Sequence, residues 1–216
     1  MNPAQAREAR RLVMRYLTEV VERFDFCPWA APARAKDELW IEAVDEDAVA
    51  DAIGRFLATP GAVIGLVILP ALPGPPARLR ALRDELLAGA IGREVALADF
   101  HPEAPLDPSH PSRLVPYLRR SPDPMLQAVR HADLSSLHRS RPMMSPADQA
   151  LVLAGKHVAP WKDPIALVAS TNLATFEAHA DEVHARLADI HADRARTYAA
   201  LAAPHPSDAD QSFFIP

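Results

Sequence analysis

Apolar side chains recur at helical spacing in the first part of the chain. One stands at every third or fourth position, at Val13, Leu17, Val20 and Phe24. This spacing predicts an amphipathic helix. Pro28 disfavours helical geometry in the residue before it, so we expect the helix to end near residue 26. The carboxyl end of a helix is the negative end of its dipole, and here it would lie beside Cys27.

Three apolar runs separated by helical patterns follow this helix. Residues 39–44 and 95–100 have the pattern of strands, and residues 62–69 form a continuous apolar run, typical of a strand covered on both faces. Helices are expected to begin near residues 45 and 76. Alternation of strand and helix predicts parallel pairing with right-handed crossovers. The expected fold class is α/β, with a small, mostly parallel sheet of about three strands flanked by helices.

The next part of the chain has many prolines and little periodicity. Residues 101–124 contain seven prolines, whose fixed φ angles favour a long ordered loop. We expect a short helix over residues 125–132 and another over residues 144–153.

A long helix is predicted near the end of the chain. Apolar residues recur at helical spacing over residues 173–201, and the helix has a possible start as early as residue 164. We therefore expect an α/β domain over residues 1–140. A C-terminal helical extension over residues 141–216 is expected to pack on it.

Composition excludes several classes of protein. The net charge of −5 gives no support for nucleic-acid binding. No apolar run approaches the roughly 20 residues of a membrane span, and the first residues lack the core of a secretory signal. We therefore expect a cytoplasmic protein without a membrane segment. One cysteine cannot form an internal disulfide, and seven glycines leave no glycine-rich phosphate loop.

The carboxyl ends of the predicted strands are the expected place for a ligand, because open α/β sheets bind ligands there. Half of the 22 prolines lie between residues 70 and 124, after these ends. His101 directly follows the third strand and suits acid–base or ligand function. The alternative is a structural hydrogen bond that closes the end of the sheet.

Cys27, the one thiol, has several interpretations. It could act as a nucleophile, a redox thiol or a metal ligand, or it could be a small buried hydrophobic residue. The expected helix end beside it raises a thiol pKa and argues against an activated thiolate.

A candidate anion site lies around the predicted helix 125–132. Arg119, Arg120 and Ser121 precede this helix, and Arg130 lies further along it. Arginine, a hydroxyl and free N–H groups at a helix N-terminus form a site for a carboxylate or phosphate. The alternative is that the arginines tie down the proline-rich loop by bonding its carbonyls.

The nine histidines do not predict a metal site. His184 and His191 are seven residues apart, which is about 10 Å along a helix axis and too far to share one ion easily. No two histidines are four residues apart. The sequence does not identify a cofactor.

Three short motifs resemble those of one bacterial family. Residues 26–30 (FCPWA), 100–102 (FHP) and 120–126 (RSPDPML) are similar to its Leu-Cys-Pro-Phe-Ala, Phe-His-Pro and Arg-Ser-Pro-Tyr-Pro-Met-Leu segments, in the same order. On these motifs the chain resembles, over roughly residues 8–140, the uncharacterised family catalogued as domain of unknown function 1415.

The departures from that family indicate a divergent member. Asp123 stands where the family has an aromatic residue, and Gln127 where it often has histidine. The resemblance implies that Cys27, His101 and Arg120 belong to one constellation, and it offers no activity to carry over.

Three hypotheses for the function follow. The first is an enzyme that acts on a small anionic substrate, with Arg120 holding the anion, His101 moving a proton and Cys27 as nucleophile or ligand. The second is a non-catalytic binding or accessory protein of a biosynthetic complex, with the C-terminal helix and tail as the contact surface for a protein partner. The third is a haem or metal protein that uses Cys27 and His101.

Overall fold

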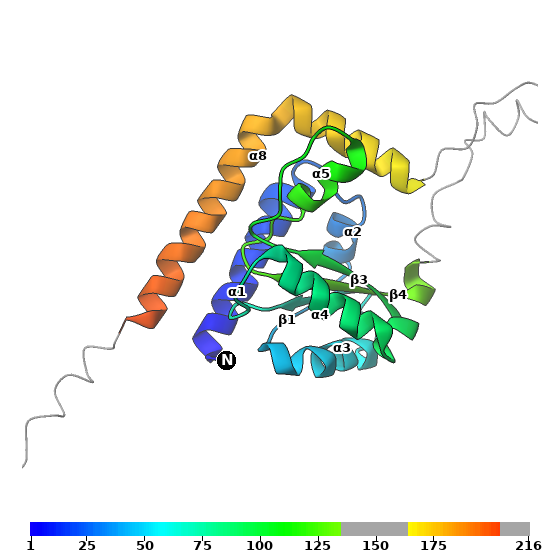
Figure 1. The fold of residues 1–216 in the computed structure, drawn as a ribbon, viewed down its shortest axis with the longest axis vertical. Helices are drawn as coiled ribbons and strands as arrows, with labels where there is room; N and C mark the ends of the chain where they lie inside the picture. The colour runs from blue at the N-terminus through cyan, green and yellow to red at the C-terminus, as the bar shows by residue number, and fades with distance from the viewer. Residues whose placement is uncertain (135–163, 204–216) are drawn as a thin grey trace, which may run out of the picture.

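The computed structural model describes residues 1–134 and 164–203. The predicted helix over residues 144–153, the apolar tail and the expected domain boundary at residue 140 lie outside these residues. The described residues form three layers, with a sheet between two groups of helices (Figure 1).

The chain begins with helix α1 (Pro3–Tyr16), as the apolar stripe predicts. Asn2 caps it, and its side chain accepts a 2.9 Å hydrogen bond from the N–H of Ala4. The helix continues as a π-helical turn, η1 (Leu17–Glu22), before the chain turns through Asp25 at a φ of 50°. A further short helix, α2 (Ala30–Ala35), follows the turn and was not predicted.

The sheet has four strands in the order β1-β2-β4-β3. Three of them are the predicted strands: β1 (Leu39–Ala43), β2 (Ile64–Ile68) and β3 (Val95–Phe100). The fourth, β4 (Met125–Arg130), lies antiparallel between β2 and β3, while β1 and β2 pair in parallel. The α/β fold is confirmed, and the sheet is mixed rather than mostly parallel.

The helix predicted for residues 125–132 is wrong, because this segment forms β4. Its methionine, leucine, glutamine and alanine residues favour a helix by intrinsic propensity. Pairing on both edges, together with burial on both faces, outweighs that preference. The proline-rich segment also differs from the expected loop, since it contains α5 (Pro111–Leu118), which begins with proline at its first position.

Helices cover both faces of the sheet. On one face lie α3 (Val49–Ala58) and α4 (Pro76–Ala88), with the short 3₁₀ turns η2 (Glu46–Ala48) and η3 (Ile91–Arg93). On the other face lie α1, η1, α2, α5 and the long helix α8 (Pro164–Ala202), which contacts α1 and α5. Helix α8 bends at His179, whose φ of −131° is not helical.

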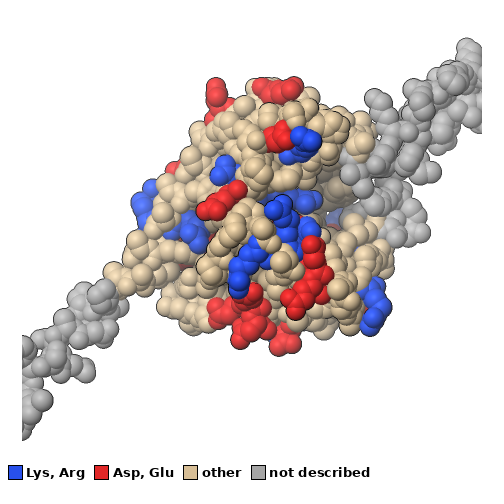
Figure 2. Space-filling view, viewed as in Figure 1, with Lys and Arg blue, Asp and Glu red and all other residues tan. Residues whose placement is uncertain are grey.

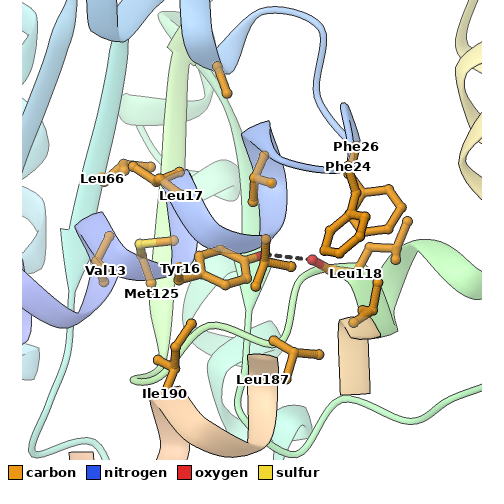
Figure 3. Close-up of a cluster of buried hydrophobic side chains, with 14 of the residues drawn as sticks. Val13, Tyr16, Leu17, Phe24, Phe26, Leu66, Leu118, Met125, Leu187 and Ile190 are labelled. Atoms are coloured by element: carbon orange, nitrogen blue, oxygen red, sulfur yellow. Dashed lines mark hydrogen bonds between the residues drawn. The ribbon is translucent and has the colours of Figure 1, made fainter. Parts of the chain in front are cut away.

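Tyr16, the last residue of α1, connects this helix to α5 over the sheet. Its ring is fully buried, and its hydroxyl donates a 2.5 Å hydrogen bond to the carbonyl of Leu118 at the end of α5. Figure 3 shows the ring between the side chains of Met125 on β4 and Leu118. This contact fixes the end of α5 above the sheet.

Close packing of α3 on the other face requires a glycine in β2. A Cβ atom at Gly65 would lie 2.7 Å from Cγ of Phe56, which is far inside van der Waals contact. The absence of a side chain at this position therefore lets α3 approach the sheet.

Candidate functional site

A cavity of about 380 Å³ lies between the sheet and the helices of the α1 face. Its floor includes Leu66, Met125 and Val129 from β2 and β4, and its walls come from α1, η1, α2, α5 and the first part of α8. The volume falls in the range of roughly 300–1,000 Å³ that is typical of small-molecule sites, which are also mostly apolar. The cavity is therefore the best candidate for a ligand site in the described part of the chain.

Arg119 is the one positively charged side chain among the described residues that line this cavity. Its guanidinium lies over the ring of Phe100, with Cζ 5.4 Å from the ring centroid. Burial lowers the pKa of Arg119 from its usual value, and Asp99 opposes this electrostatically. The Asp99 carboxylate, however, is hydrogen-bonded to Arg83. No described residue forms a side-chain hydrogen bond or an ion pair with Arg119.

The backbone of Arg119 is held by two of the sequence motifs. The N–H of His101, which follows β3, donates a 3.0 Å hydrogen bond to the carbonyl of Arg119. The N–H of Ser121 donates to the same carbonyl at 2.9 Å. The segments FHP and RSP therefore meet at Arg119, which lines the cavity.

Cys27 also lines the cavity, in the connection between η1 and α2. Burial raises the pKa of its thiol, and hydrogen bonds from the backbone N–H groups of Trp29 and Ala30 oppose that rise. The sequence predicts a helix carboxyl end beside the thiol but does not predict α2, whose N-cap Trp29 and first residue Ala30 donate these hydrogen bonds. The structure gives burial as the main cause of the raised pKa, with the thiol as the predominant form at neutral pH.

His101 does not line the cavity. Its side chain is 4% exposed, and both ring nitrogens are used. Nε2 lies 3.2 Å from the carbonyl of Gly74, and Nδ1 accepts a 3.1 Å hydrogen bond from the N–H of Glu103. These partners select the neutral tautomer with the proton on Nε2, and burial lowers the pKa of the ring. Coordination of a metal or a proton transfer by His101 would break one of these bonds.

Arg120 and Ser121 make contacts within the proline-rich segment. Nε of Arg120 donates a 2.8 Å hydrogen bond to the carbonyl of Pro102, and its guanidinium lies over the ring of Tyr117. The hydroxyl of Ser121 is fully buried and donates to the carbonyl of Asp123. Neither residue lines the cavity. Because residues 125–130 form a strand, these residues do not precede a helix N-terminus, which corrects the geometry on which the anion site was predicted.

Arg130 lies at the end of β4 and closes the carboxyl end of α3. Its guanidinium donates to the carbonyls of Phe56 at 3.0 Å, Thr59 at 3.1 Å and Leu57 at 3.2 Å, and to that of Ala62. Phe56, Leu57 and Thr59 belong to the last turn and the cap of α3, where a helix leaves carbonyls without intrahelical partners, and Ala62 lies in the loop before β2. The contacts indicate a structural role.

Asp123 is a polar residue of the motif region that the sequence did not single out as a site. Its carboxylate is fully buried and accepts hydrogen bonds from Nε of Arg194 at 2.6 Å and from the hydroxyl of Tyr198 at 2.7 Å. Burial raises the pKa of Asp123, and the two partners on α8 oppose that rise. The departure from an aromatic residue at this position could have indicated such a contact.

Two neutral amides also line the cavity. Gln127 projects from the middle of β4, and Asn172 of α8 donates a 3.0 Å hydrogen bond to the carbonyl of Phe26. Neither was a candidate from the sequence, because residues 125–132 were expected to be helical and the contact partners of α8 were not predicted.

Acidic and basic side chains are mixed on the face of the molecule that carries α4 and α5 (Figure 2). Within residues 1–134 and 164–203, no group of three or more His, Cys, Asp or Glu side chains is placed to hold a metal ion. Among the same residues, no helix combines the length and the apolar character needed to cross a lipid bilayer.

Comparisons with known proteins add no further constraint on the site. No family model, no curated protein and no solved structure matches the chain. The resemblance to the domain of unknown function 1415 therefore stays a prediction based on its three motifs.

Proposed function

We propose that the protein binds a small organic anion in the cavity, with Arg119 as the cationic partner of the ligand. The observation that carries the proposal is a guanidinium that enters an apolar cavity and has no acidic partner among the described residues. A desolvated charge without a partner is costly, and an anion bound beside it would remove that cost.

Two features favour binding of an anion over nucleophilic catalysis. Cys27 is near enough to Arg119 for an electrostatic interaction, but burial keeps its pKa raised. His101, the proposed proton carrier, has both nitrogens hydrogen-bonded outside the cavity. The hypothesis of an enzyme that uses Cys27, His101 and Arg120 stays a prediction.

The experiment is a fluorescence titration with anilinonaphthalene sulfonate, an apolar anion that reports on its own environment. Arg119→Gln should raise the dissociation constant at least tenfold. A hydrogen bond to a charged group contributes about 1.5–3 kcal/mol, and each 1.4 kcal/mol corresponds to roughly a factor of ten. Arg113→Gln is the matched control, because Arg113 lies on α5 but pairs with Asp107 at the surface.

Arg119→Lys provides a second variant. It keeps the charge and loses the planar fork of donors, so its affinity should fall between those of the wild type and Arg119→Gln. Circular dichroism of each variant checks the fold. Wild-type affinity in a folded Arg119→Gln protein would refute the proposal.

Cys27 offers an independent readout, because its thiol lines the same cavity. A saturating concentration of the sulfonate should slow alkylation of Cys27 by iodoacetamide at least several-fold. An unchanged rate would place the probe outside the cavity.

A further inference from the structure

The cavity extends along the sheet. Leu39, Ile64 and Val129 lie opposite one another on β1, β2 and β4, and all three line it. Met125 lines it as well, four residues from Val129 on β4. A strand rises about 3.3 Å per residue, so these two positions are roughly 13 Å apart.

The positive charge of Arg119 lies at one end of the cavity, near Met125. Arg119 stacks on Phe100, and Phe100 is the pairing partner of Met125. The other end, around Leu39, Ile64 and Val129, is apolar. A ligand that fits both ends therefore has an anionic group at one terminus and an apolar far end, and its body reaches about 13 Å along β4, past the amide of Gln127.

The single positive charge that lines the cavity favours an anionic group with one negative charge. One guanidinium presents a planar fork that matches a carboxylate with two parallel hydrogen bonds. A phosphate monoester carries about −1.5 to −2 charges and three acceptor oxygens at neutral pH, which call for more donors than one arginine supplies. The other polar side chains that line the cavity carry no positive charge: Gln127, Asn172, Tyr16, Trp29 and Cys27. Asn172 and Tyr16 already donate to the carbonyls of Phe26 and Leu118.

The geometry points to a medium-chain aliphatic monocarboxylate as the ligand, with its carboxylate on Arg119 and its chain along β4 towards Leu39. This inference rests on the proposed function and specifies the class of anion. The charge of Arg119 indicates a carboxylate at one end of the ligand, and the apolar far end of the cavity indicates an aliphatic chain at the other.

The test is displacement of anilinonaphthalene sulfonate from the full-length protein by a series of simple probes. Octanoate and decanoate should displace it, whereas acetate, which lacks the chain, should not. Octanol, which lacks the charge, should compete at least tenfold more weakly than octanoate. Octyl phosphate should bind no more tightly than octanoate.

The outcomes separate the two proposals. If binding of the sulfonate depends on Arg119 but neither octanoate nor decanoate displaces it, the anion site stands and the ligand class is wrong. Equal competition by octanol and octanoate, or tighter binding of octyl phosphate, would also overturn the ligand class. Loss of the dependence on Arg119 would remove both.

A variant at the far end tests the direction of the chain. Leu39→Phe places a larger side chain on the edge strand and should weaken decanoate at least fivefold while leaving hexanoate unchanged. Trp40→Phe is the matched control, because Trp40 packs against Phe56 on the opposite face of the sheet. Equal weakening of hexanoate and decanoate by Leu39→Phe would overturn the proposed orientation.

Discussion

The backbone N–H of His101 donates a 3.0 Å hydrogen bond to the carbonyl oxygen of Arg119. This bond joins the end of β3 to the end of α5 and holds the backbone from which the Arg119 side chain enters the cavity. His101 therefore contributes to the site through its backbone, while its ring ties down Gly74 and Glu103.

His101→Ala should lower the free energy of unfolding by about 1–3 kcal/mol, the usual cost of leaving buried hydrogen-bonding groups without partners. The groups affected are the N–H of Glu103 and the carbonyl of Gly74. Urea denaturation measures the change. His101→Asn keeps an acceptor near the position of Nδ1 and should lose less. Wild-type stability in both variants would contradict a structural role for the ring.

Arg119→Met should raise the free energy of unfolding of the ligand-free protein by about 1–3 kcal/mol, because it replaces an unpaired, desolvated charge with an apolar side chain of similar length. Arg130→Met is the contrasting variant. It should lower that free energy by about 2–4 kcal/mol, because four carbonyls at the end of α3 and in the loop after it lose the Arg130 guanidinium as a donor.

Thermal unfolding of the two arginine variants, without added ligand, gives the comparison directly. A stabilised Arg119→Met protein that no longer binds anilinonaphthalene sulfonate would show that Arg119 serves binding at a cost in stability. Destabilisation by Arg119→Met as large as that by Arg130→Met would instead indicate that Arg119 supports the fold.

The hydrophobic pattern along the sequence correctly predicts elements whose own apolar residues form the face that they bury. The continuous apolar run of β2 and the stripe of α1 are examples, and both form as expected. Segment 125–130 differs because its strand geometry comes from pairing with residues 64–68 and 95–100. No local signal encodes those partners, so its helix-favouring composition misled the prediction.

Some of the candidate site residues could be predicted from the sequence and others could not. Cys27 and Arg119 were identified as candidates by residue type and place, and both line the cavity. Arg120, Ser121 and Arg130 were identified by the same reasoning, yet they bond carbonyls or are buried in the loop. Which of two neighbouring arginines enters a cavity depends on how α5 ends against β3, and this contact joins distant parts of the chain.

The contact of Asp123 with Arg194 shows why the role of the C-terminal helix could not be predicted. A buried carboxylate on the segment before β4 binds an arginine 71 residues later in the chain, and Tyr198 donates to the same carboxylate. Helical periodicity identifies α8 as a helix, but it does not identify the buried charge that α8 covers.

Helix α8 should also make stability depend on pH through His191. Nε2 of His191 is buried without a hydrogen-bond partner, and burial, with Arg120 and Arg194 nearby, lowers the pKa of the ring from 6.5 to about 4. Above pH 6.5 the ring is neutral in both the folded and the unfolded chain, so this contribution to stability is fully present. As the pH falls from 6.5 towards 4, the unfolded chain binds a proton that the folded chain does not, and stability is lost.

His191→Leu removes this group and should leave stability less dependent on pH between 6.5 and 4 than in the wild type. Urea denaturation of both proteins across this range measures the difference, and the comparison cancels the contribution of Asp123, whose raised pKa acts in the opposite direction. The variant also removes an unsatisfied nitrogen, so it should be at least as stable as the wild type at pH 7. Parallel pH profiles for the two proteins would show that protonation of His191 does not destabilise the folded chain between pH 6.5 and 4.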